Sequence, residues 1–178
     1  RPDLTSYLIL PGLGDQRVYL YGRAIAQWGD AFPQDYIGLS RYDDIQLGGA
    51  LAGLDILYAD AERVRGYRDY VTGNRLLFGT LEYRIPFANN LNTEILGIIS
   101  LQRTTLTAFF DGGVVRNDNL PSGDRTVKRA GAGLELKNVL SIGGLQILHS
   151  LGLAQPVEHI GDDEHLELYY RVRAIVPF

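Results

Sequence analysis

The stretch "HLELYYRVRAIVPF", residues 165–178, decides the fold class because apolar and polar side chains alternate along nearly its whole length. One face carries the apolar positions Leu166, Leu168, Tyr170, Val172, Ala174, Val176 and Phe178. The opposite face carries the charged residues Glu167, Arg171 and Arg173. A period of two residues is that of a β-strand, and the run far exceeds the ~5–6 residues of an average strand. We therefore predict a long strand with one apolar and one polar face.

The same alternation recurs upstream and predicts an all-β chain. Seven strands are predicted near residues 4–11, 16–28, 75–87, 101–116, 128–137, 145–155 and 164–178. The connections alternate in length: "GDQ" and "NVLSIGG" are short, whereas residues 29–74 and "RNDNLPSGDRT" are long. Short turns on one rim and long loops on the other are typical of an up-and-down membrane barrel.

Composition narrows the classes of function. The chain has no cysteine, which excludes disulfides and thiolate metal sites. Its formal charge of −4 argues against a nucleic-acid partner, and its apolar runs are too short for a membrane helix. The three histidines, His149, His159 and His165, have no spacing typical of a zinc site. We expect no metal, no cofactor and no enzymatic activity.

The alternation does not tell whether the apolar faces point inward, as in a lipocalin-like ligand-binding barrel, or outward toward lipid. The long strands and the terminal Phe178 favour the outward direction. So do charges of both signs on the polar faces, which could pair across a lumen: Arg17, Arg23, Glu82, Arg84, Asp111, Arg129, Glu135, Arg171 and Arg173. The predicted fold is an antiparallel up-and-down transmembrane β-barrel, with about eight strands in this chain.

Four segments together resemble the C-terminal barrel of the bacterial surface-antigen superfamily, which includes BamA-like outer-membrane assembly factors and two-partner secretion transporters. They are "VRGY" (64–67), "LEYRIPF" (81–87), "FFDGGVV" (109–115) and "YYRVRAIVPF" (169–178). Two features depart from the family pattern. "LGG" lies at 47–49, far ahead of the Arg-Gly motif, and the family barrel has about twice as many strands. The POTRA modules that bind client chains in the family are not in this chain.

The resemblance implies specific roles. The long loop 29–74 is expected to fold back into the lumen through its lock motif, Val64, Arg65, Gly66 and Tyr67. Arg65 is expected to meet two inner-wall carboxylates, Glu82 and Asp111. The strand signal at the end of the chain corresponds to Tyr170, Val172, Ala174, Val176 and Phe178.

These residues predict the membrane-embedded barrel of an outer-membrane protein assembly or polypeptide-translocation factor. Residues 1–178 are expected to form a single barrel domain, a fragment of a longer precursor located in the bacterial outer membrane. The expected partners are outer-membrane lipid, client polypeptides or assembly partners bound through the absent upstream modules, and other copies through barrel edges. The alternative is a small structural, pore or adhesion barrel without assembly activity.

Closing the barrel requires at least one strand beyond the seven that are predicted, because bacterial barrels have even strand numbers. Residues 45–58 could supply an eighth strand, upstream strands could complete a barrel about twice this size, or two copies could pair. For the natural protein we favour the second solution, in which this chain is the C-terminal half of a larger barrel. For this chain alone we predict an eight-stranded barrel in which the strand at Thr5–Leu10 pairs with the strand at Leu166–Phe178.

Overall fold

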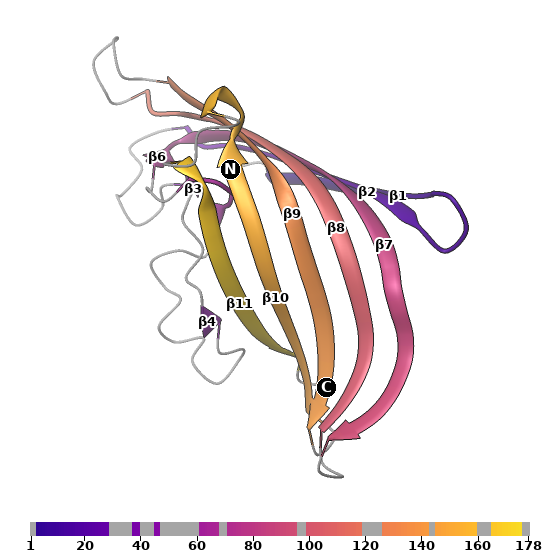
Figure 1. Cartoon of the computed structure of the whole chain (residues 1–178). Coiled ribbons are helices and arrows are strands. Elements are labelled where there is room, and N and C mark those ends of the chain that lie inside the picture. The colour runs from indigo at the N-terminus through magenta and orange to yellow at the C-terminus, as the bar shows by residue number, and fades with distance from the viewer. Residues whose placement is uncertain are drawn as a thin grey trace.

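Seven long strands form one curved antiparallel sheet in the computed structural model of the chain (Figure 1). The structure describes residues 3–28, 37–39, 45–46, 61–67, 71–95, 99–118, 126–142, 145–159 and 165–175. The long strands are β1 (Asp3–Pro11), β2 (Arg17–Ala26), β7 (Arg75–Ile95), β8 (Ile99–Arg116), β9 (Thr126–Ile142), β10 (Leu145–Pro156) and β11 (Glu167–Ile175). They lie side by side in chain order, and all seven predicted strands are confirmed.

Four short strands complete the described part. Strand β4 (Ile45–Gln46) pairs in parallel with β11 at Val172 and Arg173. Strands β3 (Ile37–Leu39), β5 (Ala61–Glu62) and β6 (Val71–Gly73) form a separate three-stranded sheet. A 3-10 turn, η3 (Val157–His159), follows β10, and no described helix could cross a membrane.

The predicted closure within this chain is wrong for the described residues. Strands β1 and β11 lie at opposite ends of the seven-stranded sheet, and the register of β1 joins it only to β2. An eight-stranded barrel has an interior just wide enough for its own wall side chains. This sheet also holds residues 61–67 and the three-stranded sheet inside its curve, so it bends too gently to close.

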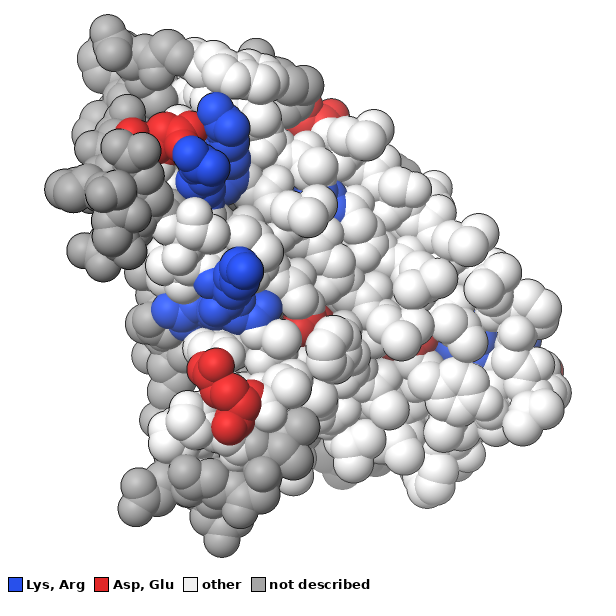
Figure 2. Space-filling model, turned by 90° about the horizontal axis from the view of Figure 1, so that it is seen from above, with Lys and Arg blue, Asp and Glu red and all other residues white. Residues whose placement is uncertain are grey.

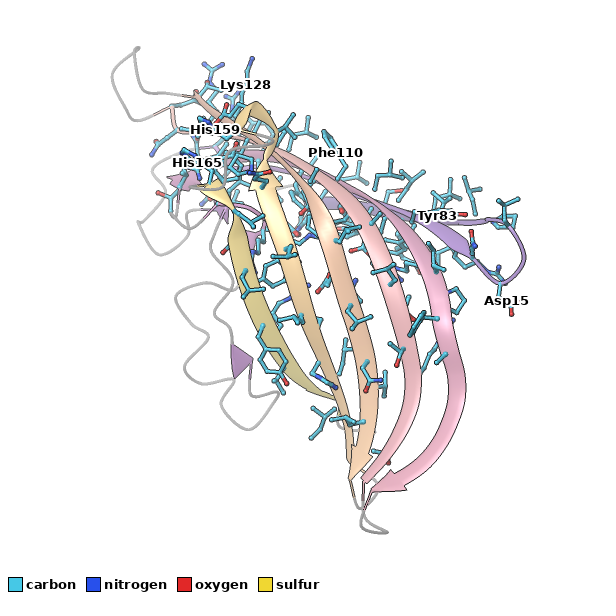
Figure 3. The ribbon with its side chains drawn as sticks, in the orientation of Figure 1. Asp15, Tyr83, Phe110, Lys128, His159 and His165 are labelled. Carbon is cyan, nitrogen blue, oxygen red and sulfur yellow. The ribbon has the colours of Figure 1, made fainter. Side chains whose placement is uncertain are left out.

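The two faces of the curved sheet differ sharply in chemistry. Large apolar side chains stand exposed on the convex face, among them Leu134 (52% exposed), Leu153 (43%) and Leu168 (64%). Phe110 points away from the concave side (Figure 3). Seen from above, most of the visible surface is uncharged, and the most prominent Lys, Arg, Asp and Glu side chains gather along one side (Figure 2). The predicted separation of apolar and polar faces is confirmed.

The concave face buries the core at the end of the sheet where the long connections lie. The small sheet contributes Ile37 and Leu39, and the lock motif contributes Val64. They pack against wall residues of β2, β7 and β8, namely Ile25, Leu76, Phe78 and Val115. This cluster fixes the small sheet, and with it the segment that follows β5, against the inner wall.

Candidate functional site: a segment that braces the concave face

Residues Glu62–Tyr67 lie across the concave face and contact six of the seven long strands. Glu62 accepts hydrogen bonds from Tyr21 Oη (2.7 Å) and Arg23 Nη1 (3.0 Å) on β2. At the other side, Arg63 pairs with Glu167 of β11 at 3.2 Å. The residues between them bind β7, β8, β9 and β10. We call residues Glu62–Tyr67 the brace, because one short segment links strands from β2 to β11.

Arg65 makes its strongest contacts with Asp111 on β8. Its Nε donates to Asp111 Oδ2 at 2.6 Å and its Nη2 donates to Oδ1 at 2.7 Å. The backbone N–H of Arg65 also donates to Oδ2, at 3.1 Å. This bidentate geometry is the strongest arrangement available to an arginine and a carboxylate, and both side chains are buried.

Two further carboxylates surround the same guanidinium. Arg65 Nη1 donates to Glu82 on β7 and to Glu135 on β9, each at 3.0 Å. The guanidinium also lies 3.5 Å from the ring centroid of Phe109, and Nη2 donates to Thr80 Oγ1 at 3.1 Å. Burial acts to lower the pKa of Arg65, but the hydrogen bonds and charge of Asp111 outweigh it and raise the pKa above its usual value.

The carboxylates around Arg65 are shared with a second layer of cations. Lys137 Nζ lies 3.2 Å from Glu82 and 3.3 Å from Glu135. Arg84 pairs with Glu82 at 2.6 Å, and Arg171 pairs with Glu135. Every carboxylate of the cluster thus faces at least one cation, which offsets the cost of burying its charge. The charges of the cluster are thus held in fixed pairs.

Gly66 turns the brace sharply against the wall. Its φ of +100° is strained for any residue with a side chain, and an added Cβ would lie 2.8 Å from the carbonyl carbon of Gln155 on β10. Its N–H donates to Glu167 at 2.9 Å. Tyr67 then donates through its hydroxyl to Glu158, at 3.2 Å. Only glycine fits position 66.

A glycine in the wall makes the close approach possible from the other side. A Cβ at Gly131 of β9 would lie 1.8 Å from the carbonyl oxygen of Arg65. The brace backbone therefore rests directly on the β9 backbone at this point. Any larger residue at position 131 would push Arg65 away from its carboxylates.

The structure brings together the residues that the sequence nominated for the lock. Val64, Arg65, Gly66 and Tyr67 all lie in the brace, and Arg65 contacts both Glu82 and Asp111. Sequence reasoning placed Glu135 on the polar face of its strand but missed it as a third partner of Arg65. It also missed Thr80 as a partner of Arg65 and Glu167 as a partner of Arg63 and Gly66. The sequence indicated only that these two residues lie on the polar faces of their strands.

The strand signal at the end of the chain is described in part. Tyr170 is exposed on the convex face, and Val172 and Ala174 lie in β11. Val176 and Phe178 lie outside the described residues.

A hollow of about 770 Å³ lies beside the brace on the concave face. Its lining carries charges of both signs: the cations include Arg17, Arg84, Arg103, Lys137 and Arg171, and the carboxylates are those of Asp15, Glu62, Glu82, Asp111 and Glu135. Among the described residues no group of His, Asp or Glu side chains is arranged to hold a metal ion. The hollow is therefore a charged space on the concave side of the sheet.

Comparison with known proteins gives no relative on which to base a function. No family model matches the chain, and neither a curated protein nor a solved structure matches it.

Proposed function

We propose that this chain forms part of the wall of a transmembrane β-barrel in the bacterial outer membrane, in a protein that inserts or translocates other polypeptides. The observation that carries the proposal is the two-faced sheet, which is apolar and exposed outside, charged inside, and crossed by a braced segment. The resemblance of the brace and its carboxylate strands to the surface-antigen superfamily directs the proposal to assembly or translocation.

The exposed convex face supports the membrane part of the proposal. Water-exposed proteins rarely present a continuous apolar surface this large. Leu77, Leu81 and Phe110 on the neighbouring strands β7 and β8 extend the exposed apolar surface that includes Leu134 and Leu153. Lipid chains cover such a surface at no cost, whereas the charged concave face needs water or ion partners.

The edges of the sheet support the polypeptide part of the proposal. All nine residues of β1 are exposed, and its outer edge faces no strand within the described residues. In hydrocarbon each unpaired backbone group costs several kcal/mol, so this edge must pair with another strand. An edge strand binds an extended chain by backbone hydrogen bonds, so a client strand can add there. The brace maintains the curvature of the sheet although the sheet does not close. The β1 edge can therefore pair with one strand and later with another.

The test is whether the protein accelerates folding of another membrane protein. Vesicles with and without the inserted protein would receive a urea-unfolded eight-stranded outer-membrane barrel, and folding would be followed by its altered mobility in unheated gels. We expect faster folding with the protein present, and a smaller effect for an Arg65→Met variant inserted to the same level. Equal rates with and without inserted protein would reject the assembly role.

The charged hollow, whose lining has more cations than carboxylates, favours one other candidate, a pore without assembly activity. In that case planar bilayers would show conductance with a preference for anions, because the lining residues Arg17, Arg84 and Arg103 face the hollow. Conductance combined with no effect on client folding would select this alternative.

A further inference from the structure

The long strands raise the question of which part of the convex face lies in hydrocarbon. Strands β7, β8 and β9 have 21, 18 and 17 residues, whereas about 9–11 residues suffice to cross a bilayer. At about 3.3 Å per residue and a tilt of about 40°, β8 alone would extend roughly 45 Å along the membrane normal. The apolar band of such barrels is only about 25 Å tall. Some feature of the convex face must therefore set the depth at which the sheet lies in the membrane.

A row of polar side chains crosses the convex face near one rim. Asn138 Nδ2 on β9 donates to Thr104 Oγ1 on β8 at 2.6 Å, and Asn138 Oδ1 lies 3.1 Å from His149 Nε2 on β10. His149 Nδ1 in turn lies 3.3 Å from the hydroxyl of Tyr170 on β11. These four residues, the polar row, alternate in sequence with inner-wall residues such as Lys137 and Ser150, so they share the outer face with Leu136 and Leu151.

The hydrogen bonds within the polar row all run in one direction, from Tyr170 toward Thr104. Because the Asn138 amide donates to Thr104, its oxygen accepts the proton of His149 Nε2, and Nδ1 of the neutral imidazole accepts the Tyr170 hydroxyl proton. Two exposed aromatic side chains flank the row: Tyr170 itself (50% exposed) and Phe87 (75%), which lies beside the residue paired with Thr104. Aromatic and neutral polar groups are enriched where hydrocarbon meets headgroups.

A basic cluster marks the opposite rim of the same face. Arg75 and Arg116 are directly paired across β7 and β8, and Asp118 bridges them at 3.0 and 2.6 Å. Lys128 is paired with Val114, next to them on β9, and lies at the end of the sheet farthest from the β7–β8 turn (Figure 3). Three cations and one carboxylate leave this cluster positive.

The spacing between the two features matches a bilayer. Along β8, Thr104 and Arg116 are twelve residues apart, and along β9, Asn138 and Lys128 are ten residues apart. At about 3.3 Å per residue and about 40° tilt, these intervals correspond to roughly 25–30 Å. This is the thickness of a hydrocarbon core.

We propose that the polar row and the basic cluster fix the depth and orientation of the sheet in the membrane. The polar row lies at the headgroups of one leaflet. The basic cluster of Arg75, Arg116 and Lys128 binds phosphate groups of anionic lipid in the other leaflet. Hydrocarbon covers only the band between them, so Leu140 and Ile147, which lie past the polar row, are outside it. This inference rests on the proposed membrane location and adds where the boundaries fall.

Single-cysteine variants can test where the hydrocarbon boundary falls, because the chain has no native cysteine. Leu134→Cys and Leu140→Cys are matched, because both leucines lie on the outer face of β9 on either side of the polar row. Each variant would carry a fluorescent label in vesicles containing lipids brominated either deep in the chains or near the headgroup. We expect the deep bromines to quench the label at 134 at least about twofold more than the label at 140. Ser150→Cys on the inner wall should be quenched by neither.

The outcomes separate this inference from the proposed function. Equal deep quenching at positions 134 and 140 would overturn the polar row as a boundary while leaving the membrane location intact. No quenching at any outer-face position would reject the membrane location itself, and the inference with it.

A second measurement tests the basic cluster. Phosphatidylglycerol would be added to the detergent-solubilised protein, and bound lipids would be counted by native mass spectrometry. The double variant R116Q/K128Q should retain several-fold less of this anionic lipid, whereas R17Q/R103Q, which removes the same charge from the inner wall, should retain as much as wild type. Unchanged binding in R116Q/K128Q would overturn the assignment.

Discussion

At the scale of single residues, Arg65 is the position on which the interior depends. One guanidinium serves carboxylates from three strands, those of Glu82, Asp111 and Glu135. Removing it would leave these charges buried with fewer counter-ions, which costs far more than losing one surface pair.

An Arg65→Met variant should lower the free energy of unfolding by about 3–5 kcal/mol, because it removes one partner of a buried ionic cluster. Urea unfolding of the lipid-inserted protein would measure the loss. Arg17→Met is the control, since within the described part of the chain the hydrogen bonds of Arg17 go to backbone carbonyls of the adjacent turn, those of Gly14 and Gln16. Similar losses for the two variants would contradict the central place of Arg65.

The coupling between Arg65 and Asp111 can be isolated from the rest of the cluster. A double-mutant cycle with Arg65→Met and Asp111→Asn should give a coupling free energy of about 1 kcal/mol or more, because the two side chains share bidentate hydrogen bonds. Strict additivity of the two unfolding losses would show that the pair does not act as a unit.

Gly66 offers a second test at the residue scale. Gly66 and Gly14 both have positive φ, at 100° and 60°, but only Gly66 is crowded by neighbouring backbone. Gly14→Ala should cost about 1–2 kcal/mol of unfolding free energy from backbone strain alone. Gly66→Ala should cost clearly more, because its Cβ would also collide with Gln155 and lift the brace. Equal losses would show that the brace does not rest on β10.

At the scale of elements, the sequence predicted the long strands well because alternation survives in each of them. It underestimated their lengths: β7 continues to Ile95 and β9 to Ile142, past the asparagines and polar residues that resemble turns. The short strands β3 and β6 went unpredicted because three-residue strands form only through tertiary packing, here around Ile37 and Leu39. The contacts of Arg65 with two of its carboxylates were predicted from the family resemblance. The sequence around Arg65 has no pattern that tells which strands this loop will contact.

The exposed leucines of the strands should respond to charge according to their surroundings. Leu134→Asp should reduce insertion into membranes, because a charge on the lipid face near mid-bilayer costs up to about 2–4 kcal/mol. Leu13→Asp is a matched control: Leu13 is 78% exposed but lies in the β1–β2 turn. Heat-modifiable gel mobility would report the folded fraction. Equal fractions for the two variants would contradict the outward placement of the apolar face.

At the scale of the whole molecule, the sheet is a curved wall and not a closed barrel in the described residues. Its outermost long strands, β1 and β11, are separated by five intervening strands. The expectation of an even strand count led us to predict a closed eight-stranded barrel. The brace and the small sheet occupy the concave side and need a wider curve than such a barrel has.

The open wall predicts that cysteines placed on the two edges will not meet. In a Tyr7→Cys/Tyr170→Cys variant of the inserted protein, oxidation should form no intrachain disulfide, because β1 and β11 do not pair. Non-reducing gels and peptide mapping would detect the bond. Its efficient formation would show that the sheet closes on itself after all.

The central claim is that lipid covers the convex face while the braced concave face holds water and charge. Spin labels at single cysteines along β10 test it most directly, using Leu151 and Leu153 for the outer face and Ser150 and Ala154 for the inner face. In membranes we expect a two-residue alternation: high accessibility to oxygen and low accessibility to a water-soluble nickel complex at positions 151 and 153, with low oxygen accessibility at 150 and 154. Nickel accessibility at 151 and 153 as high as that of a label in the exposed turn at Leu13 would contradict it.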